Sequence, residues 1–493
     1  MSDAVVVGAG GITPADVVRT ARELATVELA PEVEARILAG RAVVDRLVAG
    51  ERLIYGLNTG LGHMRDHRVE LDVLQRYQRQ MIVAHASGIG PALDTEDVRA
   101  SMLARVSGAA RGASGLTLDA VRLLVAMLNA GVHPIVPTAG SVGAGDLMHM
   151  AAIAVVMIGS GEAELNGELL PGADALARAG LEPIVAQPKE GLALVSSNGV
   201  AIGAGALVAE EALRLAILAD LACALSLEAV GGNPSPFDAA SAAAKAIPGQ
   251  IAAAAEVRAL LEGSYLYDPA TTLSVQDPLS FRVAPQVHGA YREQVTAAEH
   301  AVEVELNGIG DNPMVLVERD TLISNGNFQP MQLAFAFEAL RIGAAHVAMI
   351  SERRMNKLTT IRFSDPKLML AGLSDEEMPR RALVHYAAAS LLAELKHLAA
   401  PVSIHLPPLD LDVEDHGAVT PSVIFTTRRA LTLLDTILTC EVQMATDLMD
   451  ARGVPVLGSG TRAAYDSVQG AWSLLPAGAA PAAVVEATRV ALR

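Results

Sequence analysis

The sequence predicts a mainly α-helical protein, in which a long-helix bundle follows an N-terminal mixed domain that carries the active-site loops. Alanine and leucine supply most of its 51% hydrophobic content, which favours closely packed helices over strands. After residue 200, apolar residues recur every three or four positions through most of the chain, the spacing of one helix face. We therefore place the N-terminal domain at residues 1–200 and the helical bundle domain at 201–493.

The N-terminal domain is expected to consist of short helices separated by glycine-rich loops. A first helix should open after Thr13, because threonine caps helices well and Pro14 suits a first turn. Glycine-rich loops follow at 55–62 and 108–115. The stretch 161–169 contains an Asn-Gly pair between alternating residues, which predicts a short hairpin.

The bundle domain should contain several long helices. The most regular pattern has apolar residues at spacings of four, three, four and three, and such a stripe must be buried against helices of the same chain or of partner chains. The residues that form it are Leu333, Phe337, Leu340, Ala344 and Val347. Similar helices are expected near 203–230, 285–307, 378–400 and 421–450.

Charge and cysteine usage exclude several classes of protein. The formal net charge of −18 argues against binding to nucleic acid or an anionic membrane, which need concentrated Lys and Arg. Cys223 and Cys440 each lie in an apolar helical pattern, so we expect buried thiols rather than a disulfide framework or a metal site. The N-terminus lacks the basic segment of a secretory signal, and we expect a soluble cytoplasmic protein.

The most informative segment is 140–147, which reads Gly-Ser-Val-Gly-Ala-Gly-Asp-Leu. It resembles the signature Gly-Ser-Val-Gly-Ala-Ser-Gly-Asp-Leu of the histidine and aromatic amino-acid ammonia-lyase family, whose Ala-Ser-Gly cyclises into an electrophilic methylidene-imidazolone. Here the serine that would supply the methylidene carbon is missing, so we expect neither this group nor any other cofactor. The degenerate electrophile loop comprises Gly143, Ala144, Gly145 and Asp146.

Further blocks resemble the same family, in its order, from about residue 10 to residue 460. Tyr55 matches the active-site tyrosine, and a tyrosine on a glycine-rich loop can act as acid or base if its pKa is lowered. His85 matches a substrate-side histidine. The family's asparagine corresponds either to Ser196 without a gap or to Asn198 with a two-residue insertion, and we favour Asn198.

The block around residue 280 resembles the family's substrate-binding segment. Gln276 and Arg282 occupy its binding positions, and the planar guanidinium of arginine matches a carboxylate. Leu279 stands where ammonia-lyases usually carry a tyrosine that assists the electrophile. Serine and tyrosine are thus absent together, which indicates one coherent change of chemistry.

The last blocks contribute a phenylalanine, a lysine and a carboxylate. Phe328 resembles the residue beside the substrate ring, and Glu414 resembles the carboxylate that faces the substrate in histidine-type members. The resemblance implies an ammonia-lyase/fumarase-like fold and a homotetramer with shared active sites. It assigns Tyr55, Glu414 and Lys396 to catalysis and His85, Asn198, Gln276, Arg282 and Phe328 to substrate binding.

Without the electrophile, the chain needs a substrate that carries its own good leaving group. General acid–base groups contribute about 10²–10⁴-fold, short of the ~10⁶-fold or more expected of an enzyme. A quaternary trimethylammonium leaves as a neutral amine. The family's ergothionase branch eliminates trimethylamine from ergothioneine to give thiourocanate, and the chain resembles that branch. We therefore predict a carbon–nitrogen lyase of ergothioneine degradation whose substrate is an amino-acid betaine.

Two other functions stay open. One is an ammonia-lyase or aminomutase with an unusual electrophile, built for example on Ser141. The other is a catalytically inactive homologue that serves as a binding or assembly subunit. Retention of Tyr55, His85, Arg282 and Glu414 argues against decay of the site.

Overall fold

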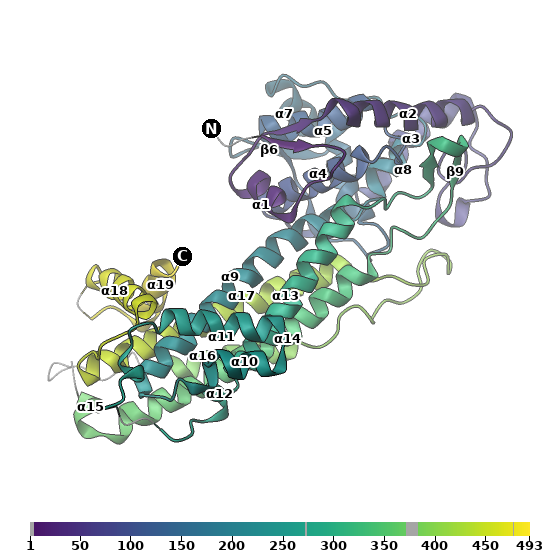
Figure 1. The fold of residues 1–493 in the computed structure, drawn as a ribbon. Helices are drawn as coiled ribbons and strands as arrows, with labels where there is room; N and C mark the ends of the chain where they lie inside the picture. Colours follow the sequence, from purple (N-terminus) through teal and green to yellow (C-terminus); the bar gives the residue numbers. More distant parts are fainter. Residues whose placement is uncertain (1–3, 272–273, 371–382, 477) are drawn as a thin grey trace. The chain divides into compact units, whose positions relative to one another are not determined.

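The computed structural model describes residues 4–271, 274–370, 383–476 and 478–493. It confirms the mainly α-helical fold class (Figure 1). Contacts between residues group the chain into two compact units. Unit 1 comprises residues 1–210, 298–337 and 401–425, and unit 2 comprises 211–297, 338–400 and 426–493. Each unit is assembled from three separate segments, and the division at residue 200 that the sequence suggested stays a prediction.

Unit 1 combines short helices with small sheets. Its shorter helices are α1 (Pro14–Arg22), α2 (Pro31–Leu47), α3 (Leu71–His85), α4 (Thr95–Ala110), α5 (Leu118–Ala130), α6 (Leu147–Met157), α7 (Gly172–Arg178) and α8 (Glu190–Val195). Its strands are β1 (Val5–Val7), β2 (Val27–Leu29), β3 (Ile89–Ala92), β4 (Val132–Pro134), β5 (Pro137–Ala139), β6 (Glu162–Leu165), β7 (Glu168–Pro171), β8 (Met314–Leu316) and β9 (Thr321–Ile323).

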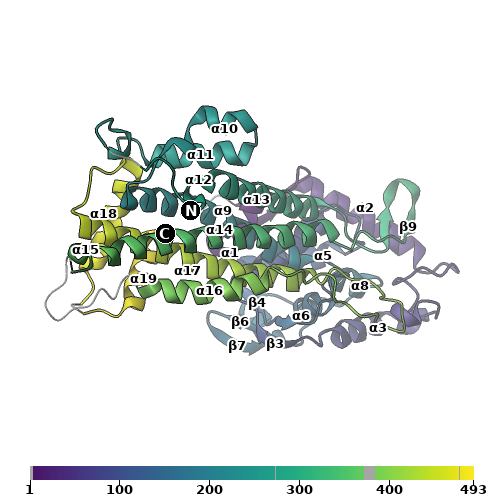
Figure 2. The same ribbon diagram turned by 90° about the horizontal axis from the view of Figure 1, so that it is seen from below.

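The longest helices carry residues of both units: α9 (Gly199–Val230), α13 (Ala284–Asn307), α14 (Met331–Ser364) and α17 (Thr420–Arg452). The other helices of unit 2 are α10 (Ala239–Lys245), α11 (Pro248–Leu260), α12 (Leu279–Arg282), α15 (Pro366–Leu370), α16 (Val384–Leu398), α18 (Ser459–Ser473) and α19 (Pro481–Ala491). Within unit 2, α9, α13, α14, α16 and α17 run side by side (Figure 2). The helices expected from periodicity are confirmed, except that 378–382 lie outside the described residues.

Local sequence signals explain how unit 1 begins and turns. Helix α1 is capped as expected, since the Thr13 hydroxyl accepts the Asp16 N–H while the Asp16 carboxylate accepts the Thr13 N–H. β6 and β7 form the expected hairpin. Asn166 and Gly167 both adopt positive φ at its tip, which is the geometry of a tight two-residue turn.

Helix α4 forms the centre of unit 1 and is buried along nearly its whole length. It packs against α1, α2 and α5. A side chain at Gly203 of α9 would lie 2.5 Å from the Ala100 carbonyl carbon, so the two helix backbones touch. The Arg105 guanidinium pairs with Asp311 at 2.9 Å, both fully buried. This pair fixes the turn that brings residues 312–328 to the site.

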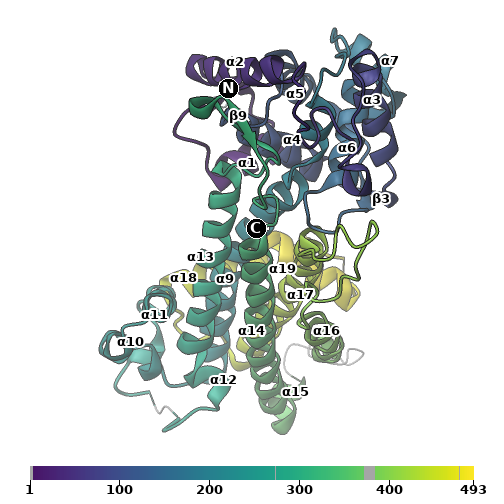
Figure 3. The same ribbon diagram turned by 90° about the vertical axis from the view of Figure 1, so that its right-hand side faces the viewer.

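Elsewhere in unit 1, α3 packs against α6 and α8, and Figure 3 shows α3 beside α6. These three helices carry parts of the candidate site. Gly191 of α8 lies so close to α3 that an added Cβ would contact the Gln78 backbone oxygen at 3.0 Å. The Gly191 N–H also donates to the Gln78 side-chain oxygen at 3.0 Å. The close approach of α8 to α3 therefore fixes the distance between two of the helices that carry the site.

Unit 2 has an apolar core with an embedded ion pair. Arg354 and Glu441 are completely buried and form two hydrogen bonds of 2.5 and 2.8 Å, and Ser226 donates to the same carboxylate. Cys223 and Cys440 are free and buried, as expected. Burial raises the pKa of each thiol to about 12, so neither is a reactive thiolate at neutral pH.

Two helical stretches, 190–230 and 331–364, are long and apolar enough to cross a membrane by length and composition alone. Their most apolar windows are 94% and 61% buried within the protein. Burial of this kind is typical of core helices, which pass the same test of length and hydropathy.

Candidate active site

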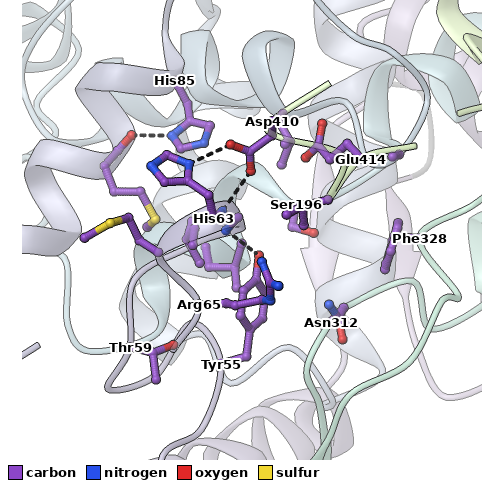
Figure 4. Close-up of a pocket in the computed structure, with 18 of the residues that line it drawn as sticks. Tyr55, Thr59, His63, Arg65, His85, Ser196, Asn312, Phe328, Asp410 and Glu414 are labelled. Atoms are coloured by element: carbon purple, nitrogen blue, oxygen red, sulfur yellow. Dashed lines mark hydrogen bonds and ion pairs between the residues drawn. The ribbon is translucent and has the colours of Figure 1, made fainter. Parts of the chain in front are cut away.

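A cavity of about 1020 Å³ lies in unit 1 (Figure 4). Its walls come from five parts of the sequence: the tyrosine loop 53–66, helix α3, the loop leading into α6 together with α8, the segment 312–328, and the loop 410–416. The structure brings together in it the predicted residues Tyr55, His85, Ala144, Phe328 and Glu414.

Tyr55 lies on the loop that follows α2. Asn58 fixes this loop by accepting the Ile54 N–H and donating to the Arg52 carbonyl. The Tyr55 hydroxyl oxygen accepts the Gly62 N–H at 3.4 Å. Burial raises the pKa of Tyr55, the Gly62 N–H opposes this rise, and the negative charge of Glu414 adds to it. The tyrosine is therefore a phenol in the free protein, and a cation bound beside it would favour the phenolate.

His85 ends helix α3. Its Nδ1 lies 2.8 Å from the Met81 carbonyl oxygen. A carbonyl only accepts, so Nδ1 carries the proton, and in the neutral ring Nε2 is an acceptor. His85 therefore presents a ring with a fixed tautomer to the cavity.

Glu414 lies on a tight hairpin. Leu409 and Glu414 exchange two backbone hydrogen bonds, of 2.8 and 3.2 Å. Burial raises the pKa of the Glu414 carboxyl, the like charge of Asp410 raises it further, and His85 opposes both. The cavity thus holds a carboxyl that gains its proton more readily than a solvated glutamate.

The degenerate electrophile loop connects β5 to α6 as a closed turn. Gly143 and Gly145 both adopt positive φ. Ser141 donates to the Asp146 carboxylate at 2.8 Å and accepts the Gly143 N–H at 3.1 Å. Ser141 is thus engaged within the turn and is not a wall residue of the cavity. This arrangement disfavours an electrophile built on Ser141.

Asp146 anchors this turn from within the protein. It is completely buried, and its second carboxylate oxygen accepts the Ala201 N–H at the start of α9, at 2.8 Å. Burial raises its pKa. Asp146 in turn helps to raise the pKa of Glu305 to about 7, although burial of Glu305 is the larger cause.

Ser196 and Asn198 occupy different places. Ser196 contributes to the cavity wall, whereas Asn198 lies behind it and donates to the Phe328 carbonyl at 3.0 Å. The same carbonyl accepts the Gly145 N–H at 3.1 Å. Among the described residues, the Asn198 side-chain oxygen has no hydrogen-bond partner. Asn198 therefore joins the phenylalanine loop to the degenerate electrophile loop, and Ser196 faces the cavity.

Three predicted site residues lie in unit 2 and not in this cavity. Gln276 and Arg282 line a second pocket of about 680 Å³, together with Lys357. The Gln276 amide oxygen, in the orientation that satisfies both groups, accepts from Arg282 Nη2 at 3.0 Å. Lys396 is exposed on α16 and lines neither pocket.

The sequence did not single out two polar residues of the cavity wall, His63 and Asp410. His63 directly follows the glycine-rich stretch 55–62, and Asp410 precedes Glu414 by four residues. Their nearness to recognised positions was the available signal. Within the described part of the chain, no group of three or more His, Cys, Asp or Glu side chains is arranged to hold a metal ion.

The long helices and this assembly of tyrosine, histidine and carboxylate define a class of helical lyases, and comparison with known proteins agrees. The model of the aromatic amino acid lyases matches residues 12–470. The histidine ammonia-lyase of Stigmatella aurantiaca is 38% identical over 459 residues, which cover 92% of this chain and 89% of that protein. The chain belongs to the histidine and aromatic amino-acid ammonia-lyase family and is a carbon–nitrogen lyase.

Solved structures of several activities share this fold. The ergothionase of Treponema denticola, in complex with desmethyl-ergothioneine sulfonic acid, has a TM-score of 0.93 and 28% identity, covering 99% of this chain and 98% of that chain. The tyrosine aminomutase of Streptomyces globisporus has a TM-score of 0.91 and 30% identity, covering 99% and 96%. The histidine ammonia-lyase of Trypanosoma cruzi has a TM-score of 0.88 and 28% identity, covering 99% and 93%.

The Glu414 carboxyl should titrate above the value of about 4.3 that is usual for glutamate, because burial and Asp410 disfavour its charged form. His85→Ala should raise this pKa further, since the His85 ring opposes the rise. The measurement is the infrared carboxyl signal as a function of pH, taken as the difference between each protein and its Glu414→Gln version. The control is His397→Ala, at an exposed position on α16, which should leave the pKa of Glu414 unchanged. A Glu414 pKa at or below 4.3 would contradict this account.

Proposed function

We propose that this lyase eliminates trimethylamine from an amino-acid betaine, with ergothioneine as the preferred substrate and thiourocanate as the product. The carrying observation is that Ala144 lines the cavity and is followed directly by Gly145, without the serine that builds the family's electrophile. Tyr55, His85 and Glu414 still surround the cavity. A site that retains its acid–base groups but lacks the electrophile suits a substrate that brings its own leaving group.

The charge of the cavity wall favours a cationic group. Its described ionisable residues include four carboxylates and one guanidinium, which gives 1 − 4 = −3 with the histidines neutral. A negative wall raises the local concentration of a quaternary ammonium. The aromatic faces of Tyr55 and Phe328 would each add about 0.5–2 kcal/mol. The charged residues counted are Asp66, Asp410, Glu414, Asp415 and Arg65.

The chain's own groups suffice for the elimination. The Tyr55 phenolate takes the proton from the carbon next to the ring, and that C–H electron pair becomes the new carbon–carbon double bond. The carbon–nitrogen pair leaves with nitrogen as neutral trimethylamine, and Tyr55 becomes a phenol again. The ammonium lowers the pKa of Tyr55 while it is bound. Glu414 polarises the ring, and we assign Lys396, which lines neither pocket, to the same task in the active site of a neighbouring subunit.

The cavity wall contains one guanidinium, that of Arg65, but not the pair of residues expected from the sequence to hold the substrate carboxylate. Gln276 and Arg282 offer the suitable pair of groups, and we propose that they act in the active site of a neighbouring subunit of a homotetramer. Apolar side chains left exposed on unit 2 support such an assembly, because large exposed apolar patches mark interfaces. They include Leu213 and Ile217 of α9 and Ile342 and Met349 of α14.

A histidine ammonia-lyase or an aminomutase is the alternative, favoured by the identity to the Stigmatella enzyme. It requires an electrophile that the turn of residues 140–147 would have to form without its serine. The likeness to the ergothionase supports the betaine reaction instead. We also propose a cytoplasmic location, since both cysteines are free thiols and a reducing compartment maintains that state.

The subunit mass should equal that of the encoded sequence, because no serine stands between Ala144 and Gly145 to lose water during cyclisation. Intact-protein mass spectrometry measures this directly, and borohydride, which reduces the methylidene group, should not inactivate the enzyme. A deficit of two waters localised to residues 140–147 would refute the proposal.

Ergothioneine should be consumed and plain histidine should not, since only the former carries a quaternary ammonium, which cannot be deprotonated and leaves as a neutral amine. Tyr55→Phe should reduce turnover about 10²–10⁴-fold, the usual contribution of a general base. Glu414→Gln should lower kcat more than it changes KM, because it acts on charge that develops in the transition state. Arg282→Lys should mainly raise KM, since a point charge replaces a two-pronged clamp.

The assay follows product absorbance together with trimethylamine release. Tyr386→Phe is the matched control, because Tyr386 is 75% exposed on α16, and it should retain full activity. Histidine and its trimethyl betaine serve as comparison substrates. Rapid urocanate formation from histidine would return the chain to the ordinary ammonia-lyases.

The protein should be a tetramer in solution, because its exposed apolar helix faces need a partner and Arg282, the proposed carboxylate ligand, does not line the cavity. Light scattering at micromolar concentration measures the mass. Ile342→Glu should weaken the assembly and lower activity together, whereas Glu256→Lys, which changes charge on α11 without altering an apolar face, should not. A fully active monomer would rule out the shared active site.

A further inference from the structure

Two loops of unit 1 meet at the cavity through one carboxylate. The tyrosine loop carries Tyr55 and His63, and the hairpin 409–414 carries Asp410 and Glu414. Asp410 accepts the His63 backbone N–H at 3.0 Å, and its other oxygen lies 2.7 Å from His63 Nδ1 (Figure 4). Tyr55 and Glu414, which we propose act on the substrate, therefore lie on two loops that the contact between Asp410 and His63 joins.

The contact with Asp410 fixes the backbone next to the Tyr55 hydroxyl. Two successive amides point to the two groups: the Gly62 N–H to Tyr55, at 3.4 Å, and the His63 N–H to Asp410. Gly62 adopts a positive φ, and a Cβ there would lie 1.9 Å from the Asp410 carboxylate. The carboxylate therefore fits directly against this peptide, and the glycine is required by both its conformation and its neighbour.

The hairpin is built to present Asp410. Asp410, Leu411 and Asp412 all adopt positive φ, a conformation that side-chain-bearing residues adopt only when the surrounding structure enforces it. The paired backbone bonds between Leu409 and Glu414 hold the ends of this turn together, and the Val413 N–H donates to the Asp410 carbonyl.

We propose that Asp410 is a positioning residue that locks the Gly62–His63 backbone so that the Gly62 amide keeps facing the Tyr55 hydroxyl. The proposal deepens the proposed function, because Tyr55 is its base. Asp410 has two opposing effects on Tyr55. Its negative charge raises the pKa of the phenol, whereas the Gly62 N–H that it holds in place lowers that pKa by a larger amount.

Besides Asp410, two titratable groups act on the pKa of Tyr55. Glu414 faces it from the hairpin and Tyr77 from α3, and both raise its pKa, while burial is the largest cause of the rise. None of these is removed when Asp410 is changed. A substitution that removes only the charge of Asp410 can therefore be separated from one that also releases the Gly62–His63 backbone.

The test compares Asp410→Asn with Asp410→Gly. Asparagine keeps an acceptor for the His63 N–H, so the pKa of Tyr55 should fall as the negative charge is lost. Glycine suits the positive φ of this position, but it has no side chain to accept the His63 N–H. The Gly62 amide is then no longer held against the Tyr55 hydroxyl, and the pKa of Tyr55 should rise. The measurement is phenolate absorbance against pH, as the difference between each variant and the same variant with Tyr55→Phe.

Asp412→Gly is the matched control, because Asp412 is exposed, shares the positive φ and lies outside the cavity wall. It should leave the pKa of Tyr55 unchanged. Asp410→Gly should also lower kcat/KM with the betaine by about 10²-fold, the usual cost of misplacing a reacting group, and Asp412→Gly should not. Shifts of the same sign in both Asp410 variants, or an equal shift in the Asp412 control, would overturn the proposal. The titration needs no substrate, so it remains decisive even if trimethylamine release fails.

Discussion

The buried Asp146 carboxylate is the constraint on which the site depends. It is fully enclosed, and it holds the Ser141 hydroxyl on one side and the first turn of α9 on the other. A buried carboxylate is tolerated only when it is well hydrogen-bonded, so these partners cannot move independently. The loop of residues 140–146 is consequently closed although the family's serine between Ala144 and Gly145 is missing. The Phe328 carbonyl also holds this loop, because it accepts hydrogen bonds from Gly145 and Asn198.

Without the family's serine, the proposed chemistry of the cavity depends on charge rather than on a covalent adduct. The phenol of Tyr55 and the carboxyl of Glu414 each have a raised pKa because they are buried, and the negative groups near them reinforce that shift. Both effects oppose ionisation of the empty site. A bound cation reverses the balance, because it favours the phenolate and the carboxylate together. The same substrate that supplies the leaving group would therefore activate the base.

The sequence predicted more of the fold than of the site. Helix periodicity located α9, α13, α14 and α17, since long buried faces leave a regular pattern. It could not show that unit 1 takes in residues 298–337 and 401–425, because periodicity carries no information on contacts between distant segments. Motif spacing likewise named Glu414 but not Asp410, whose importance comes from a neighbour 347 residues away. Nor could the sequence show that Ser196 lines the cavity while Asn198 hydrogen-bonds to the Phe328 carbonyl.

One chemical argument links the missing serine to the proposed quaternary substrate. The family's electrophile works by bonding to the nitrogen of the substrate, which requires a lone pair on that nitrogen. A trimethylammonium has none, so the electrophile would contribute nothing and its methylidene carbon would only occupy space beside the three methyl groups. A Cβ placed at Gly145 would meet Ser196 at ordinary contact distance, 3.6 Å. Under the proposed function, loss of the serine removes a group that a quaternary substrate cannot use.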